Sequence, residues 1–202
     1  MLRVGGASCQ AWEASMVVLI IGLVLFLGVH TIAVAGLRDA ALQRMGEGPY
    51  KGLYSLVSAA GLAAIVVGYG MARSQPIVAW LPPVWARHLS LTLMLPVFPL
   101  LLAAYLPGRI QRATKHPMLL ATKIWATAHL LANGMVHDLL LFGGFLAWAV
   151  AVRVSLKRRA PRAIAMAPPT PANDAIAVVA GLALYLATLW RVHLWLIGVA
   201  PM

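Results

Sequence analysis

Long apolar runs separated by short basic or proline-containing segments dominate this chain. An α-helix needs about 20 mainly apolar residues to cross the hydrocarbon core of a bilayer. The runs therefore predict an all-α, polytopic membrane bundle of about six transmembrane helices. Their approximate ranges are 16–36, 53–72, 88–106, 117–136, 138–154 and 174–199. Residues 1–15 are expected to form a weakly structured N-terminal extension to a transmembrane domain at 16–202, and Met16 is a plausible alternative to Met1 as the translation start.

Prolines, glycines and a short connection between spans four and five add detail to the predicted series of spans. Pro96 and Pro99 predict a kink in the third span, because proline removes a backbone donor from the helix. His137 falls between spans four and five and is expected in a solvated turn. Small residues in spans two and five predict close helix contact. These residues are Gly61, Gly68, Gly70, Gly143 and Gly144.

The charge distribution predicts how the chain lies in a membrane. Residues are 62% hydrophobic and 10% charged, with a net charge of +11. Lipid is the expected partner and nucleic acid is not, because the basic residues gather in loops between spans. The positive-inside rule then places both termini outside and the basic loops in the cytoplasm, in a bacterial inner membrane. The loop residues are Arg38, Arg44, Lys51, Arg109, Arg112, Lys115, Arg153, Lys157, Arg158, Arg159 and Arg162.

The acids and the cysteine disfavour several classes of function. All five acidic residues lie outside the predicted spans or at their ends. A proton-driven carrier usually needs carboxylates within the membrane, and a carboxylate-bridged di-iron centre needs several of them. Cys9 is the only cysteine, so this chain alone forms no disulfide, cysteine-based zinc site or iron–sulfur cluster.

Two histidines are the strongest candidates for chemistry. His30 and His129 lie well inside spans one and four, where a polar group needs a reason to be present. Histidine is a common ligand of haem iron and other metals. Trp125, His129 and Asn133 are spaced four apart, which places them on one helical face beside a cofactor. The alternative is a histidine bonded to a neighbouring helix, which is less favoured for two residues in so small a bundle.

Other histidines lie near the ends of spans. His88 and His116 begin spans three and four, where a capping or interfacial role explains them as well as ligation does. His193 is a further ligand candidate in span six. The sequence leaves open whether His129 pairs with His30, His88 or His193 at one iron.

Two cations could hold the acidic group of a cofactor. Arg191 lies beside His193, and Lys123 lies about one turn inside span four, within reach of a haem propionate. The alternative for each is a side chain that extends along apolar surface to the nearer membrane face.

Several segments together resemble the NnrU family of bacterial membrane proteins over nearly all of residues 16–202. They are LVLFLGVH, RMGEGPYKGLYSL, GYGMAR, PPVWARH, HPMLL, WATAHLLANG and LFGGFLAWAV. The family is related to 15-cis-zeta-carotene isomerase, and that resemblance implies haem b with ligands at His30 and His129. His116 matches the histidine of a His-Pro pair in the relative. NnrU itself is associated with denitrification.

The resemblance and the residues together define three hypotheses. The first is a haem b membrane protein that acts as a redox-controlled cis–trans isomerase on a hydrophobic polyene or isoprenoid, such as a carotenoid, which enters from lipid. The second is a non-enzymatic haem accessory, sensor or electron-transfer protein in nitrogen-oxide metabolism. The third is a structural subunit whose histidines bond between helices. The oligomeric state is left open.

Overall fold

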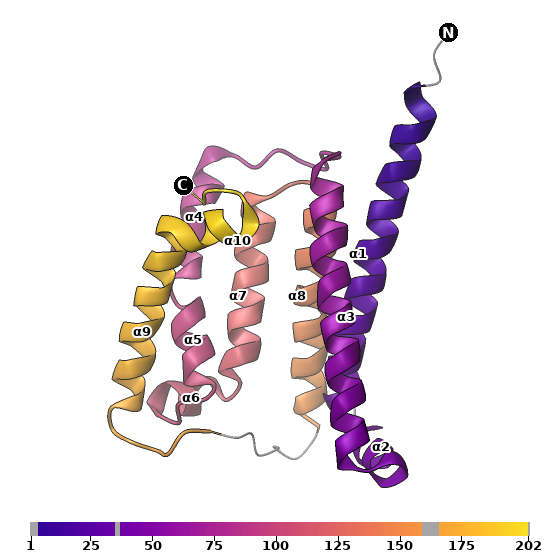
Figure 1. Ribbon diagram of the computed structural model, residues 1–202. Helices are drawn as coiled ribbons and strands as arrows, with labels where there is room; N and C mark the ends of the chain where they lie inside the picture. Colours follow the sequence, from indigo (N-terminus) through magenta and orange to yellow (C-terminus); the bar gives the residue numbers. More distant parts are fainter. Residues whose placement is uncertain (1–3, 35–36, 159–165, 202) are drawn as a thin grey trace. The chain divides into compact units, whose positions relative to one another are not determined.

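The computed structural model describes residues 4–34, 37–158 and 166–201, and helices make up most of them (Figure 1). Among the described residues no named strand forms, and Val78 and Met135 make an isolated antiparallel bridge. The helices divide into two compact units. The first holds the described residues up to 81 and those of 133–158. The second holds residues 82–132 and 166–201.

The first unit is built on two long helices that run side by side. They are α1 (Val4–Val34) and α3 (Glu47–Arg73), and they make the most extensive helix pairing of the unit. Between them in the chain lies α2 (Leu37–Met45), which contacts both. The fourth helix, α8 (Val136–Leu156), packs mainly against α1 and more sparsely against α3.

Glycines allow the α1 and α3 backbones to meet closely. A Cβ added at Gly22 would lie 2.5 Å from the Ile65 nitrogen, and one added at Gly61 would lie 2.7 Å from the Phe26 nitrogen. Gly68 meets the α1 backbone in the same way. The predicted close contacts at Gly61 and Gly68 are therefore confirmed, and Gly22 extends the same interface.

The other predicted glycine contacts differ. Gly144 of α8 has ordinary van der Waals spacing, with 3.7 Å between its added Cβ and the Leu23 side chain. Nothing lies within 4 Å of an added Cβ at Gly70 or Gly143. The prediction of close packing is wrong at these two positions, because they lie on helix faces that turn away from the described neighbours.

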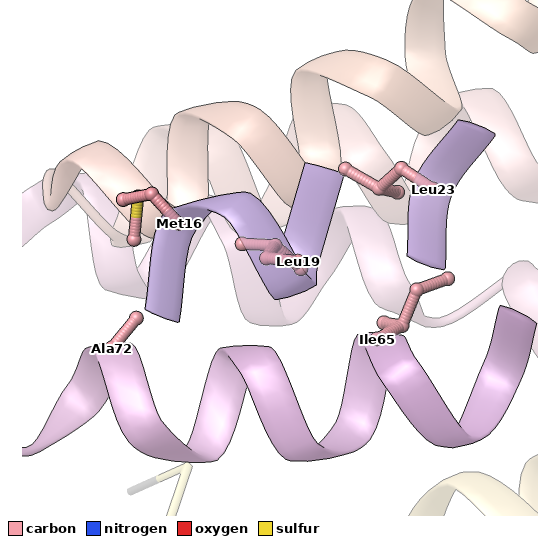
Figure 2. Close-up of a cluster of buried hydrophobic side chains, with 5 residues drawn as sticks. All are labelled: Met16, Leu19, Leu23, Ile65 and Ala72. Carbon is pink, nitrogen blue, oxygen red and sulfur yellow. The ribbon is translucent and has the colours of Figure 1, made fainter. Parts of the chain in front are cut away.

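A buried apolar cluster fills one part of the α1–α3 interface. Figure 2 shows Met16, Leu19 and Leu23 of α1 opposite Ile65 and Ala72 of α3. The α1 helix begins at Val4 and is continuous through the segment expected to be weakly structured. Trp12 packs against the cluster, and Ser15 is buried. Within the described residues 4–15 the chain is therefore helical, and Trp12 has an apolar partner surface.

The second unit contains shorter helices. In chain order they are α4 (Val84–Met94), α5 (Val97–Ala103), α6 (Arg109–Thr114), α7 (Pro117–Ala132), α9 (Asn173–Ala187), the π-helical turn η1 (Thr188–Val192) and α10 (His193–Ile197). Helix α7 packs against α4 and α5, and α9 packs against α5. The Ser90 hydroxyl of α4 lies 2.6 Å from the carbonyl of Ala128 in α7 and donates to it.

The predicted kink in the third span is a break between two helices. The first, α4, ends at Met94, and α5 begins at Val97 after Pro96. Pro99 lies in the first turn of α5, where the missing N–H has no helical partner to lose. Gly181 of α9 lies against the Pro99 ring and backbone, so the break also carries the α5–α9 contact.

Five helical segments in the described part of the chain are long and apolar enough to cross a membrane. Two of them combine consecutive elements: α4 with α5, and α9 with η1 and α10. Their ranges are Ala11–Ile32, Glu47–Arg73, Val84–Ala103, Val136–Leu156 and Asn173–Ile197. The fourth predicted span corresponds to α7, which has 16 residues. At 1.5 Å per residue its length is about 24 Å, less than the roughly 30 Å of a typical hydrocarbon core. The chain is thus an all-α polytopic membrane protein with one short helix in the series.

Candidate functional site

His30 is oriented by a bond within its own helix. Its Nδ1 donates to the carbonyl of Phe26, one turn earlier in α1, at 2.6 Å. A carbonyl only accepts, so the proton of the neutral ring is on Nδ1 and the lone pair is on Nε2. Metal-ligating histidines commonly have this arrangement, with one ring N–H bonded to a carbonyl and the other nitrogen on the metal.

Aromatic rings from three helices surround His30. Its ring centroid lies 4.4 Å from that of Phe26 and 5.5 Å from that of Tyr54 in α3. Trp148 of α8 lies 6.3 Å away with its ring perpendicular, and its Nε1 donates to the Thr31 hydroxyl at 3.1 Å. The surroundings of His30 are therefore apolar and aromatic, although the Tyr54 hydroxyl and the Trp148 N–H add polar groups at their edges.

His129 repeats the local arrangement in the second unit. Its Nδ1 donates to the carbonyl of Trp125, one turn earlier in α7, at 2.9 Å. The two ring centroids are 5.2 Å apart, which confirms that Trp125 and His129 share a face. The helix α7 ends at Ala132, and Asn133 directly follows it.

The candidates at the start of α7 are both half-buried. His116 immediately precedes the helix, and its carbonyl accepts from the Leu120 nitrogen at 3.1 Å. Pro117 occupies the first helical position, as is common for proline. Lys123 lies nearly two turns into α7. The backbone of His116 thus begins the helix.

The C-terminal candidates lie at a π-helical turn. Arg191 is exposed within η1, and His193 begins α10. The His193 Nδ1 donates to the Val199 carbonyl at 2.7 Å, across the left-handed Gly198 that ends α10. That bond folds the end of the chain back onto the histidine. His88 is exposed on α4.

His137 is buried, so its expected place in a solvated turn is wrong. Its exposure is 4%, because α8 begins at Val136 and includes His137 in its first turn. The next residue, Asp138, accepts from the Tyr69 hydroxyl at 2.6 Å and from the Met135 nitrogen at 3.2 Å. The His137 Nε2 lies 3.6 Å from an Asp138 oxygen. This cluster bonds the end of α3 to the start of α8, and no pattern in the sequence indicated it.

A second cluster of residues, which the sequence did not reveal, lies beside Tyr54 and away from His30. Tyr50 and Tyr54 are one turn apart in α3, and their ring centroids are 6.2 Å apart. The guanidinium carbon of Arg38 lies over the Tyr50 ring, 5.6 Å from its centroid. The Tyr50 hydroxyl is buried and has no hydrogen-bond partner among the described residues. The four-residue spacing of the two tyrosines in GPYKGLYSL was the available signal.

Histidines are the candidate metal ligands among the described residues. Among them no three His, Cys, Asp or Glu side chains come together as a metal site. A haem iron takes only one or two axial ligands from the protein, and the porphyrin supplies the rest. Single histidines with a fixed tautomer, beside aromatic rings, are chemically suited to that role.

The fold is that of a polytopic α-helical membrane protein. Two of its histidines are oriented by bonds to backbone carbonyls of their own helices. The sequence model of the family described as NnrU protein matches residues 18–201, so the chain belongs to the NnrU family. The match extends through both compact units. No curated protein and no solved structure matches the chain.

Proposed function

We propose that this NnrU-family protein binds haem b, with His30 and His129 as axial ligands. The observation that carries the proposal is the shared geometry of the two histidines: each donates Nδ1–H to the carbonyl of an aromatic residue one turn earlier. That bond leaves Nε2 as the basic nitrogen and raises its basicity toward a metal. His116 and His193 are the reserve ligands.

The surroundings of His30 support a large, flat, apolar ligand. Phe26, Tyr54 and Trp148 present ring faces and edges around the imidazole. An apolar setting favours burial of a porphyrin and helps to set the potential of its iron. When bound, haem supplies a redox-active Lewis-acidic iron. The chain's own residues would orient the ligand imidazoles and place aromatic rings beside them.

The activity we propose is cis–trans isomerisation of a hydrophobic polyene or isoprenoid that enters from the bilayer. Such a reaction moves no proton to or from the substrate. The ring contacts described for His30 accordingly consist of aromatic side chains. The proposed location is the bacterial inner membrane, with the basic loops in the cytoplasm. The rival is a haem accessory, sensor or electron-transfer protein in nitrogen-oxide metabolism.

Absorption spectroscopy tests haem binding. Protein purified after haem-replete expression should show a Soret band that shifts on reduction. His30→Ala and His129→Ala should each alter the band, since each removes an axial nitrogen. His88→Ala is the matched control, because His88 is exposed on α4 and should leave the spectrum unchanged. A wild-type protein without a Soret band would exclude haem, and a spectrum sensitive to His88 alone would exclude the ligand assignment.

A second measurement separates the enzyme from the accessory protein. The reduced holoprotein is incubated with a panel of cis-polyenes, and the isomers are resolved by chromatography. Conversion that is absent from wild-type protein prepared without haem supports the isomerase. Haem retention without conversion of any cis-polyene, together with nitric oxide binding to the reduced form, supports the accessory role.

A further inference from the structure

We propose that the Arg38 guanidinium and the Tyr50 hydroxyl form a subsite for one oxyanion, a carboxylate or a phosphate, at the His30 end of the first unit. The two groups come from α2 and α3 and meet where Arg38 covers the Tyr50 ring. Tyr54 lies between Tyr50 and His30, with centroids 6.2 Å from one and 5.5 Å from the other. The subsite is therefore the polar end of an aromatic row that begins at His30.

The first evidence for a ligand comes from the Tyr50 hydroxyl. It is buried and bonded to nothing in the described structure. Buried hydroxyls almost always have a partner, because leaving one unpaired forfeits its hydration without compensation. An acceptor atom from a bound molecule would satisfy it.

The state of Arg38 is the second observation. Its side chain is only 22% exposed, so most of its surface is covered by protein. The carboxylate beside it is that of Asp39, whose nearest oxygen is 3.8 Å away and whose side chain is 78% exposed. A pair this long and this solvated contributes little. Arg38 therefore has donors to offer, and guanidinium donors match carboxylate and phosphate oxygens.

The neighbouring acid is already engaged. Glu47, at the start of α3, pairs with Lys51 one turn later at 2.7 Å. Lys51 is the main partner of Glu47, and Arg38 acts on Glu47 only as a weaker charge, which leaves the Arg38 donors for an incoming oxyanion. Gly46 makes the approach of α2 to α3 sterically accessible, because its φ of 80° lies in the region that favours glycine. The local backbone thus brings Arg38 over Tyr50.

Two molecules carry the required chemistry at this place. One is haem held by His30, whose propionate would meet Arg38 and Tyr50; this source rests on the proposed function. The other is the phosphate of a membrane phospholipid. Both predict the same pairing of a guanidinium and a phenol with one oxyanion, and they differ in which molecule loses affinity when the pair is removed.

The first arm of the test uses haem. Full-length protein freed of haem is titrated with haemin and with haemin dimethyl ester, in which both propionates are blocked. The wild-type protein should bind haemin about tenfold more tightly than the ester, as expected for a charge-assisted hydrogen bond. Arg38→Gln and Tyr50→Phe should each remove most of that preference while the His30-dependent Soret band persists. Arg44→Gln, a change on the same helix, should keep it.

The second arm uses lipid. Native mass spectrometry measures retention of phosphatidylglycerol against diacylglycerol, which lacks the phosphate, on the same proteins. Loss of the phosphatidylglycerol preference in Arg38→Gln and Tyr50→Phe, with Arg44→Gln unchanged, identifies a lipid phosphate. A wild-type protein that binds no haemin refutes the proposed function and leaves this arm to decide the subsite. If Arg38→Gln and Tyr50→Phe change neither preference in folded protein, as checked by circular dichroism, the oxyanion subsite is refuted.

Discussion

At the residue scale, one local rule orients both ligand candidates. His30 follows Phe26 by four residues, and His129 follows Trp125 by four. In each case Nδ1 donates to the carbonyl of that aromatic residue. A helix brings residues four apart onto one face, so a single turn supplies both the bond that selects the tautomer and the ring beside the imidazole. The spacing of aromatic residue and histidine is thus a local device for presenting Nε2.

The buried Tyr69–Asp138 bond leads to a stability prediction. Tyr69→Phe should lower the free energy of unfolding by about 1–3 kcal/mol, because it removes a hydrogen bond to a buried carboxylate. Tyr105→Phe is the matched control, since the Tyr105 side chain is half exposed and its change should have an effect within about 0.5 kcal/mol. Reversible SDS unfolding of purified protein measures both. Equal losses in the two variants would contradict a specific role for the bond.

At the element scale, small residues decide which helices can approach closely. The α1–α3 pair places Gly22, Gly61 and Gly68 where a methyl group would overlap backbone atoms of the partner helix. Lipid offers little hydrophobic drive for helices to associate, so van der Waals contact between backbones carries much of the stabilisation. This interface is therefore sensitive to added volume.

Two glycines in α3 provide a paired test of this interface. Gly68→Ala should destabilise the protein by about 1–3 kcal/mol, because the added methyl meets the backbone of Leu19 and one helix must shift. Gly70→Ala should be neutral or stabilising by up to about 1 kcal/mol, since no atom lies within 4 Å and alanine favours the helix. The same SDS unfolding assay compares them. A loss in Gly70→Ala as large as that in Gly68→Ala would mean that propensity rather than contact governs α3.

A similar prediction applies in the second unit, at the break between α4 and α5. Gly181 of α9 lies against Pro99 of α5, so Gly181→Ala should reduce stability by about 1–3 kcal/mol. Gly143→Ala in α8 has open space around it and serves as the control. Thermal unfolding followed by circular dichroism reports both. An unchanged midpoint in Gly181→Ala would show that the α5–α9 contact relaxes without cost.

At the scale of the whole molecule, the family match and the helices of membrane-spanning length cover nearly the same part of the chain. The NnrU match covers residues 18–201, and five helices in the described ranges have the length and apolarity of membrane spans. The basic residues used to predict orientation include Arg159 and Arg162, which lie outside the described residues. Orientation in the membrane stays a prediction of the charge pattern.

Cysteine labelling tests that orientation. In a Cys9→Ser background, Gln75→Cys should react with a membrane-impermeant maleimide in intact spheroplasts, because residue 75 follows α3 on the predicted outer side. Lys157→Cys, just after α8, should react only after permeabilisation. Both positions are exposed, so accessibility alone does not separate them. The reverse labelling pattern would invert the predicted topology.

Most of the helices were predictable from the sequence. The errors concern single residues whose surroundings depend on other helices. The apolar runs correctly indicated the all-α fold, and Pro96 correctly indicated the break between α4 and α5. The chain gave no equivalent sign that His137 is buried, because its burial depends on the distant Tyr69–Asp138 bond. Glycine content predicted close packing at Gly143 without saying which face of α8 has a neighbour.

The sequence by itself determined the membrane class, the family, and the histidines worth testing. The membrane class and the histidines depend on composition, on periodicity and on residues four apart, which are short-range along the chain. The family depends on the match along residues 18–201. Tertiary structure alone decided that Asn133 lies beyond α7 and that His137 is enclosed. It also decided that Arg38 covers a buried Tyr50 hydroxyl beside the His30 aromatic row. Those facts depend on where helices end and which faces meet, since side chains from different elements become neighbours only when the helices pack.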